Sequence, residues 1–390
     1  MNAIPHVMCV FGTRPDAVKM CPLVLELQRR PGLRTTVALT AQHREMLDAV
    51  TELFGVKADY DLNIMKPAQT LESITADILA GMADVLREAK PDLILVHGDT
   101  STCFVASLAA FYAKIPVGHV EAGLRSFDRW SPFPEEMNRR MVGQLAELHF
   151  APTAQNRANL AAEGITAGVY VTGNTVIDAF AYTVRDGYTF ADERLRAIDF
   201  ADGRRYITLT AHRRENQGEG IASICRAVRR IVDEHPDVVV IYPVHLSPAV
   251  RNTVFPLLEG HERIVLCDPV GLSDMHNLLA KSTLVLTDSG GLQEEAPSLG
   301  VPVLVLRTET ERPEAVDAGT VKVIGVDEDT IVAETHTLLT DSAAHAAMAH
   351  AVNPYGDGHA SERIADAIEE WARERAASGR RGSHILDLCR

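Results

Sequence analysis

Short apolar runs alternate with amphipathic segments along most of the chain. Each run is bounded by polar turn residues, which is typical of strands buried on both faces of a parallel sheet. Helical periodicity fills the intervals between runs, most clearly at 15–30, 70–89, 102–114 and 360–377. The predicted strands are 7–11, 34–39, 93–97, 116–120, 148–151 and 168–171, followed by 206–210, 238–242, 263–267, 283–287, 302–306 and 321–325. This alternation predicts an α/β fold with doubly wound parallel sheets.

A polar, weakly patterned stretch between residues 174 and 205 interrupts the alternation. The chain has 390 residues, which is too many for one ordinary hydrophobic core. We therefore expect two Rossmann-like α/β domains, residues 1–173 and 174–359. Residues 378–390 are rich in Gly, Ser and Arg at their start and are expected to form a mobile tail.

Composition narrows the class of protein. The formal net charge is −15, which argues against a general nucleic-acid or anionic-membrane surface but leaves room for a local basic pocket. No apolar run approaches the roughly 18 residues that a membrane span requires, and no signal-peptide pattern is present. The six cysteines lack Cys-x-x-Cys spacing, which fits structural thiols in a reducing compartment. We expect a cytoplasmic protein that contacts neither nucleic acid nor membrane.

Three carboxylates of the segment 92–140 are candidate functional groups. Asp99 follows the strand predicted at 93–97, Glu121 follows the next strand, and Glu135 comes shortly after. Ligands of open α/β sheets bind at the carboxyl ends of the strands, so these acids are candidates for proton chemistry on a small molecule. The alternative is structural, with Asp99 capping the next helix and Glu121 pairing with Arg125. The glycines beside both residues favour the catalytic interpretation for the set.

The first strand runs into a turn that is suited to anions. Pro15 is well placed as the first residue of a helix, whose N-terminus presents free N–H groups. Arg14 in the turn and Lys19 one turn later would add two cations. An ordinary strand–helix connection is the alternative. The chain has no Gly-x-Gly-x-x-Gly and no Walker sequence, so we expect neither NAD nor ATP and no other cofactor.

The second half contains a closer match to a phosphate cradle. Ser289, Gly290 and Gly291 follow the strand at 283–287 and lead into a helix. The glycines would let phosphate oxygens approach the backbone amides, and Glu295 could accept hydrogen bonds from ribose hydroxyls. A tight turn that caps a helix is the alternative. The ligand interpretation is favoured because two glycines make a costly helix cap.

Histidine loops complete the candidates. His212 follows the strand at 206–210 with Arg213 beside it, and this pair suits a diphosphate; His245 is a weaker candidate of the same kind. The Asp-x-Asp sequence at 59–61 is discounted as a chance match. No His-Glu-x-x-His sequence is present, so no metal site is expected.

Taken together, these segments resemble the bacterial non-hydrolysing UDP-N-acetylglucosamine 2-epimerase family. The resemblance runs from residue 7 to about residue 370 and rests on many ordered segments. They are Gly12–Pro15, Thr40–Asp48, His97–Thr100, His119–Arg125, Pro134–Glu136, Thr172–Asp178, His212–Asn216, Tyr242–His245, Thr287–Pro297, Glu311–Glu314 and Asn353–Gly358.

The resemblance implies a fold of the GT-B type, with the ligand cleft between two domains and the helix 360–377 packing back on the first. It implies reversible conversion of UDP-N-acetylglucosamine to UDP-N-acetylmannosamine without NAD, and it implies a homodimer. By matched position, the functional residues are Arg14, Lys19, Asp99, Glu121, Glu135 and His212. The matched UDP-binding residues are Ser289, Gly290, Gly291, Glu295 and Arg312, which makes 174–359 the UDP-binding domain.

The resemblance also implies a second nucleotide sugar that acts as an activator. The matching positions are Gln42, His43, Gln69 and Glu136. Met275 stands where an aromatic residue commonly contacts the uracil ring, and a thioether can still cover a ring face. Asp16 replaces the usual Glu after Gly12–Pro15.

The expected chemistry agrees with these residue types. Expelling UDP from C1 while a base removes the C2 proton gives a 2-acetamidoglucal, and reversal from the opposite face inverts C2. The acids would move the protons, and the cations would hold the released UDP. The sequence leaves open which carboxylate acts on which face. Three alternatives remain: a hydrolysing epimerase, a glycosyltransferase of the same fold, and a nucleotide-sugar sensor. The sensor is disfavoured because all three acids are present.

Overall fold

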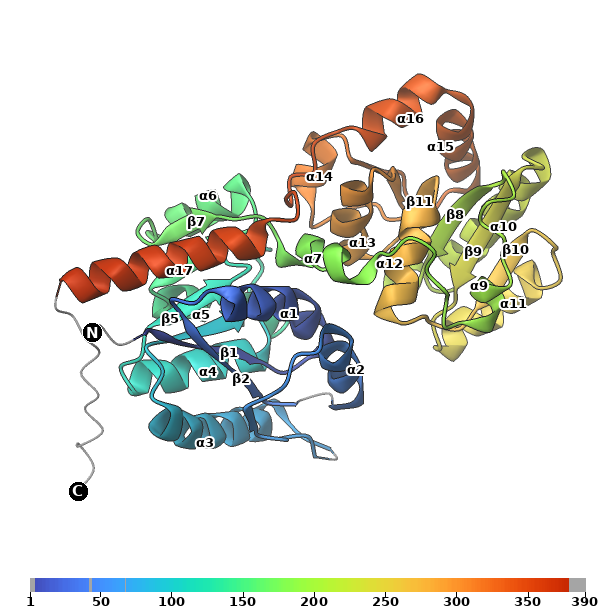
Figure 1. The fold of residues 1–390 in the computed structure, drawn as a ribbon. Coiled ribbons are helices and arrows are strands. Elements are labelled where there is room, and N and C mark those ends of the chain that lie inside the picture. The colour runs from blue at the N-terminus through green and yellow to red at the C-terminus, as the bar shows by residue number, and fades with distance from the viewer. Residues whose placement is uncertain (1–3, 42–43, 67, 379–390) are drawn as a thin grey trace. The chain divides into compact units, whose positions relative to one another are not determined.

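The computed structural model describes residues 4–41, 44–66 and 68–378. It divides into two compact units, the first formed by residues 1–179 with 355–390 and the second by 180–354 (Figure 1). The boundary between the first and second units therefore falls after Ala179. The boundary predicted from sequence was after Gly173. The expected tail lies outside the described residues except for Ser378.

Unit 1 is built on one seven-stranded parallel sheet. The strand order is β3-β2-β1-β4-β5-β6-β7. Its strands are β1 (His6–Phe11), β2 (Arg34–Leu39), β3 (Tyr60–Asp61), β4 (Leu93–His97), β5 (Val117–Val120), β6 (Leu148–Ala151) and β7 (Val169–Val171). Its helices are α1 (Arg14–Arg29), α2 (Arg44–Phe54), α3 (Leu71–Ala89), α4 (Ser101–Tyr112), α5 (Glu135–Leu145), α6 (Ala154–Ala162), α7 (Thr175–Asp178) and α17 (Ala360–Ala377).

Unit 2 repeats this plan with a six-stranded parallel sheet. The strand order is β10-β9-β8-β11-β12-β13. Its strands are β8 (Arg205–Thr210), β9 (Val238–Pro243), β10 (Ile264–Cys267), β11 (Leu284–Thr287), β12 (Val303–Val305) and β13 (Val321–Val323). Its helices are α8 (Phe180–Thr183), α9 (Glu193–Arg196), η1 (Arg214–Asn216), α10 (Glu219–Glu234), α11 (Pro248–Leu258), α12 (Leu272–Lys281), α13 (Gly290–Glu295), η2 (Ala296–Leu299), α14 (Pro313–Asp317), α15 (Glu328–Thr340) and α16 (Ser342–Ala349).

The central strands are buried along their whole length. Every residue of β1, β4 and β9 is buried, which explains why these strands are continuous apolar runs rather than alternating ones. Helices cover the sheets and form the cores with them, α3 and α4 in unit 1 and α10 and α15 in unit 2. The predicted doubly wound α/β class is thus confirmed for both units. None of the described helices has both the length and the apolar character of a membrane span.

One strand was missed in the sequence. β3 pairs with β2 through Ala38 and Tyr60, although its surroundings are polar. The Asp59 side chain accepts a hydrogen bond from the backbone N–H of Val37 at 2.8 Å, and Asp61 pairs with Arg44 at 2.6 Å. Both carboxylates therefore fasten an edge strand, in agreement with the decision to discount them as metal ligands.

Each sheet reverses its strand order at one point. In unit 1 the reversal lies between β1 and β4, and in unit 2 between β8 and β11. Crevices at the carboxyl ends of such strand pairs are the usual ligand sites of doubly wound folds. The turns that follow these four strands carry the Gly12 turn, Asp99, His212 and the Ser289–Gly291 turn. Both candidate sets predicted from sequence therefore lie at topological switch points.

Candidate active site

The turn between β1 and α1 is shaped by a close approach of chains. A Cβ atom on Gly12 would lie 1.9 Å from the Thr40 hydroxyl oxygen and 2.7 Å from that of Thr102, so only glycine fits. Thr13 caps α1, and Asp16 completes a capping box by accepting from the Thr13 backbone N–H at 3.2 Å. The turn therefore begins α1 at a fixed place, with Arg14 as its first residue and Lys19 one turn later.

Lys19 reaches the first of the predicted acids. Its ammonium forms an ion pair with Glu121, which follows β5. Asn174 donates a side-chain hydrogen bond to the same carboxylate at 2.9 Å. Glu121 has a φ of +62°, a left-handed conformation that non-glycine residues rarely adopt and that is often found at functional sites. The backbone thus turns sharply to aim this carboxylate.

The structural alternatives for these acids are wrong. Arg125 pairs with Glu163 at 2.7 Å, not with Glu121. The cap of α4 is Thr100, whose side chain accepts from the backbone N–H of Cys103 at 3.3 Å, so Asp99 is not needed for capping. Asp99 is therefore not the helix cap, and Glu121 is not the partner of Arg125.

Asp99 is close enough to Glu121 for the charge of one to affect the other. Burial raises the pKa of the Asp99 carboxyl above its usual value, and the negative charge of Glu121 adds to the increase. Arg139 opposes it, with its Nε 3.4 Å from the carboxylate. A carboxyl whose pKa is raised in this way holds a proton more readily than an exposed one, as a general acid must.

Glu135 is placed near this pair only through its helix. It is the first residue of α5, one turn before Arg139, so the two side chains share a helix face. Among the described residues no ion pair to Glu135 is found. The structure therefore brings Asp99 and Glu121 together, while the nearness of Glu135 to them stays a prediction.

A buried histidine that sequence reasoning missed lies beside one of the predicted acids, Glu121. The His97 ring lies between Asp16 and Glu121, with Nδ1 and Nε2 each 3.4 Å from one carboxylate oxygen. The ring is only 4% exposed. The family-like sequence His97–Thr100 contained this residue, but nothing in it indicated the partners. His97 and Asn174 are the positioning residues that the tertiary structure adds.

In unit 2 a buried aspartate orders the loop after β8. Asp288 is fully buried and accepts hydrogen bonds from the backbone N–H groups of His212 and Arg213, each at 2.8 Å. The Asn216 side chain donates to the same oxygen at 3.1 Å. Asp288 was read only as part of the glycine turn, and its role as an anchor for the histidine loop was missed.

The Ser289–Gly291 turn is flanked by cationic side chains. A Cβ on Gly290 would lie 3.7 Å from a guanidinium nitrogen of Arg213 and 3.8 Å from one of Arg312, so both cations border the turn. Ser289 is the cap of α13 but makes no side-chain capping bond. The turn therefore combines a hydroxyl that makes no capping bond with two cations on its border, an arrangement suited to phosphate oxygens.

The Glu295 carboxylate lies beside a buried histidine, His276. The His276 Nε2 lies 3.4 Å from its carboxylate, and the His276 Nδ1 is hydrogen-bonded to the Thr183 hydroxyl at 2.7 Å. Met275, on α12 next to His276, is partly exposed. Arg312 pairs with the buried Glu294, which fixes its guanidinium beside the turn.

His212 is partly exposed and stays neutral more readily than a free histidine. Burial lowers its pKa, and His245 and Arg213 lower it further, against the opposing charge of Asp288. The His212 and His245 rings stack with centroids 5.4 Å apart. A neutral imidazole at this position can donate one hydrogen bond and take up a proton when an anion arrives.

The residues matched to the activator site have local partners where they are described. Gln42 and His43 lie outside the described residues. The Gln69 side chain donates to the carbonyl of Ile64 at 2.7 Å. Glu136 is fully buried and accepts from the backbone N–H groups of Ser126 and Phe127 at 2.9 and 3.3 Å. These bonds stabilise loops, and the activator role stays a prediction.

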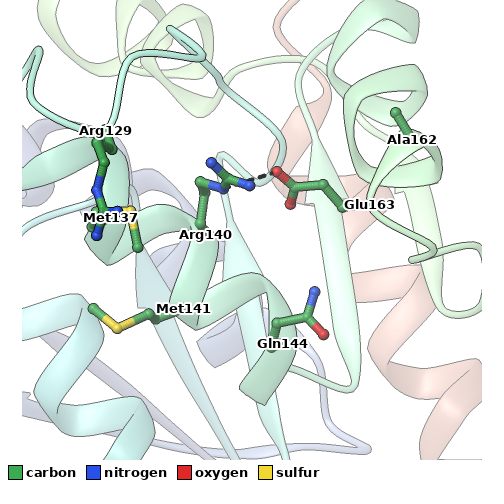
Figure 2. Close-up of a pocket in the computed structure, with 7 residues that line it drawn as sticks. All are labelled: Arg129, Met137, Arg140, Met141, Gln144, Ala162 and Glu163. Atoms are coloured by element: carbon green, nitrogen blue, oxygen red, sulfur yellow. Dashed lines mark ion pairs between the residues drawn. The ribbon is translucent and has the colours of Figure 1, made fainter.

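A separate hollow of about 640 Å³ lies along α5. Figure 2 shows Arg140 facing Glu163 across it, an ion pair of 3.2 Å, with Met137 and Met141 on the same helix. None of the predicted site residues lines this hollow. We therefore do not include it in the candidate active site.

This chain is similar to known proteins along most of its length. The family model described as UDP-N-acetylglucosamine 2-epimerase matches residues 25–369. The chain belongs to this family. The UDP-N-acetylglucosamine 2-epimerase of Bacillus subtilis is 53% identical over 363 residues, 93% of this chain and 94% of that protein. The enzyme of that name from Escherichia coli K12 is 50% identical over 370 residues, 93% of this chain and 98% of that protein.

Solved epimerase structures share the fold. The crystal structure of UDP-GlcNAc 2-epimerase from Neisseria meningitidis, bound to UDP-GlcNAc, matches with a TM-score of 0.83 and 48% identity, and covers 94% of this chain and 100% of that one. The two doubly wound units are thus those of the GT-B type. Membership of this family supports epimerase activity on a UDP-sugar.

Proposed function

We propose that this chain interconverts UDP-N-acetylglucosamine and UDP-N-acetylmannosamine by elimination and re-addition of UDP, without releasing free sugar. A carboxylate removes the C2 proton as the C1–O bond to UDP breaks, and the electron pair of the C2–H bond forms the C1–C2 double bond. The 2-acetamidoglucal then receives a proton on the opposite face of C2 while UDP adds again to C1. No oxidant or reductant is consumed.

The observation that carries the proposal is the contrast between Asp99 and Glu121. Glu121 is held as a carboxylate partner of Lys19 and Asn174, whereas burial raises the pKa of Asp99. Two acids at adjacent strand ends, of which Asp99 holds a proton more readily than an exposed carboxyl, supply groups for the removal and delivery of a proton. Glu135 is proposed as a third member on the strength of the family resemblance.

The unit 2 residues support a role in holding the diphosphate. The guanidinium groups of Arg213 and Arg312 border the Gly290 turn, and the Ser289 hydroxyl is free of a capping bond. Charge that builds up on departing UDP would be stabilised by these cations and by His212. Glu295, braced by His276, is proposed to accept from ribose hydroxyls, and Met275 to cover the uracil ring. The structure of the Neisseria relative, solved with UDP-GlcNAc bound, favours this ligand class.

Turnover in deuterated water tests the proposal. We expect UDP-N-acetylmannosamine that carries solvent deuterium at C2, because the proton removed on one face is replaced from solvent on the other. The products are followed by NMR, with no NAD or metal added. A C2 hydrogen that is wholly retained in the epimerised sugar would contradict the elimination.

The same experiment separates the hydrolysing alternative. If free N-acetylmannosamine and UDP accumulate in equal amounts, the intermediate is hydrated rather than recombined. Control reactions with the Glu121→Gln variant establish that any label comes from the enzyme. The homodimer, the activator site and the cytoplasmic location stay predictions.

A further inference from the structure

Three metal-ligating side chains meet at one end of α10. Glu234 is the last residue of α10, His235 is its C-cap, and His336 projects from α15. Their possible ligand atoms all lie within 4.8 Å of one another. Within the described ranges, no other group of three His, Cys, Asp or Glu side chains has this spacing. No metal site was expected from the sequence, which lacks a His-Glu-x-x-His pattern. His235 and His336 are 101 residues apart, so no local pattern joins them.

The separation of the two imidazoles matches that of a shared ion. The His235 Nε2 and His336 Nδ1 atoms are 3.2 Å apart. Two Zn–N bonds of about 2.0–2.1 Å at a tetrahedral angle place their nitrogens about 3.3–3.4 Å apart. A hydrogen bond between the rings would also suit this distance. The Glu234 carboxylate, however, adds a third ligand of the kind that borderline metals accept and that a ring–ring hydrogen bond does not require.

The positive charge of Arg205, which acts on His235, is balanced by Asp237. The Arg205 guanidinium makes two bonds of 2.6 and 2.9 Å to the Asp237 carboxylate.

The exposed positions give an ion access to the group. His336 and Glu234 are both exposed, whereas His235 is 8% exposed. Among the described residues, the cationic partner of Glu234 is Arg230, and it is distant, 3.9 Å from the carboxylate. An ion can therefore enter from solvent without displacing a strong contact.

We propose that Glu234, His235 and His336 form a binding site for a divalent transition-metal ion of the zinc type, completed by water. The ion would cross-link the C-terminal end of α10 to α15. The site is independent of the proposed epimerase chemistry, because α10 begins just after the His212 loop and its 16 residues span about 24 Å. Bound metal is thus expected to act on the stability of unit 2.

Zinc titration of the full chain tests the site. After chelator treatment, calorimetry at pH 7.5 should show one Zn²⁺ per chain, with affinity reduced at least tenfold in His336→Ala. The matched control is His359→Ala, which removes an exposed histidine 3.1 Å from Glu362 but with no second histidine beside it. We expect zinc binding by this control to equal that of the unaltered chain.

A stability readout and a second variant guard against misinterpretation. Zinc should raise the melting temperature of the unaltered chain and not that of His336→Ala. Glu234→Gln should weaken zinc binding without changing the melting temperature measured in the absence of zinc. Zinc affinity should fall in acid, since protons compete with the metal for the imidazoles. Unchanged zinc binding in His336→Ala would overturn the proposal, as would zinc bound only at the stacked His212 and His245. No binding up to millimolar Zn²⁺ would leave the rings as a hydrogen-bonded pair and also overturn it.

Discussion

The Glu121 carboxylate is held by side chains from three different elements. Lys19 comes from α1, His97 from the end of β4, and Asn174 from the cap of α7. Side chains with several partners lose little further freedom when a substrate binds, which favours catalysis by positioned groups. The left-handed backbone at Glu121 is consistent with strain that these contacts stabilise.

Neutralising the acids should slow turnover far more than it weakens binding. We expect Asp99→Asn and Glu121→Gln each to lower kcat by roughly 10²–10⁴, the usual range for an acid/base group, with a much smaller effect on UDP affinity. Steady-state kinetics and calorimetry with UDP measure the two quantities.

The exposed Asp84 supplies a matched control for these variants. Its side chain is 77% exposed, and its ion-pair partner within the described part of the chain is Arg87, three residues on. Asp84→Asn should therefore leave both quantities unchanged. Turnover near that of the unaltered enzyme in both acid variants would remove Asp99 and Glu121 from the chemistry.

Two adjacent strands of unit 1 carry buried histidines opposite each other. His119 on β5 is in register with His149 on β6. Burial lowers the pKa of His119 to about 3 and that of His149 to about 4. The His119 ring also bonds the carbonyl of Gly98 at 2.7 Å, so it supports the turn that carries Asp99. The His119 and His149 rings are therefore neutral in this part of the sheet at physiological pH.

Acid should therefore destabilise the protein before its carboxylates are protonated. The unfolded histidines take up protons below about pH 6.5, while the folded ones do so only near pH 3–4, so stability falls as pH drops through this window. At pH 5 each of these histidines should lower the free energy of unfolding by roughly 2 kcal/mol relative to neutral pH. Urea unfolding midpoints between pH 7.5 and 5 measure the loss.

A variant that cannot be protonated checks the cause. His149→Asn should lose less stability over this range than the unaltered chain, whatever its stability at pH 7.5. His359→Asn, which alters an exposed histidine, should leave the dependence unchanged. Equal losses in His149→Asn and the unaltered chain would show that other groups govern the acid response.

At the scale of the whole molecule, the two units differ in how their chain is assembled. Unit 2 is one continuous segment, residues 180–354, whereas unit 1 needs the helix α17 from the far end of the sequence. Figure 1 shows α17 lying along unit 1. Its apolar face carries the buried Ile364, Ile368 and Trp371, and the Trp371 indole donates to Glu147 at 2.8 Å.

This difference predicts unequal behaviour of fragments. Residues 180–354 expressed alone should fold cooperatively, while 1–179 alone should unfold easily because the surface under α17 is exposed. Fusing 355–378 to 1–179 through a flexible linker should restore a cooperative transition. Circular dichroism melts of the three fragments measure this, and a fully stable 1–179 fragment would contradict it.

A point variant isolates the contribution of the helix within the full chain. Trp371→Ala removes a side chain that is 7% exposed, and such truncations cost about 3–5 kcal/mol. Arg375→Ala, whose guanidinium lies over the same ring but is partly exposed, is the milder control. Equal stability of the two variants would show that α17 is held chiefly by its charged contacts.

The sequence by itself determined the strands, the two switch-point turns and the family. Apolar runs and glycine turns are local features, because burial on both faces and close backbone approach restrict which residues can stand there. The two-residue strand β3 was missed because its polar neighbours gave no such pattern. The Ser289–Gly291 turn and Asp99 were predicted as site residues from the same kind of local pattern, a strand end followed or preceded by glycine.

The tertiary structure alone decided which side chains meet. His97 and Asp16 are 81 residues apart, Lys19 and Glu121 are 102 apart, and His235 and His336 are 101 apart. No local pattern encodes such pairs, since each depends on strand order, helix packing and side-chain direction at once. The sheets bring these residues together only after every intervening element is in place. That is why the partners of Glu121 and the histidine pair beside α10 could be read only from the folded chain.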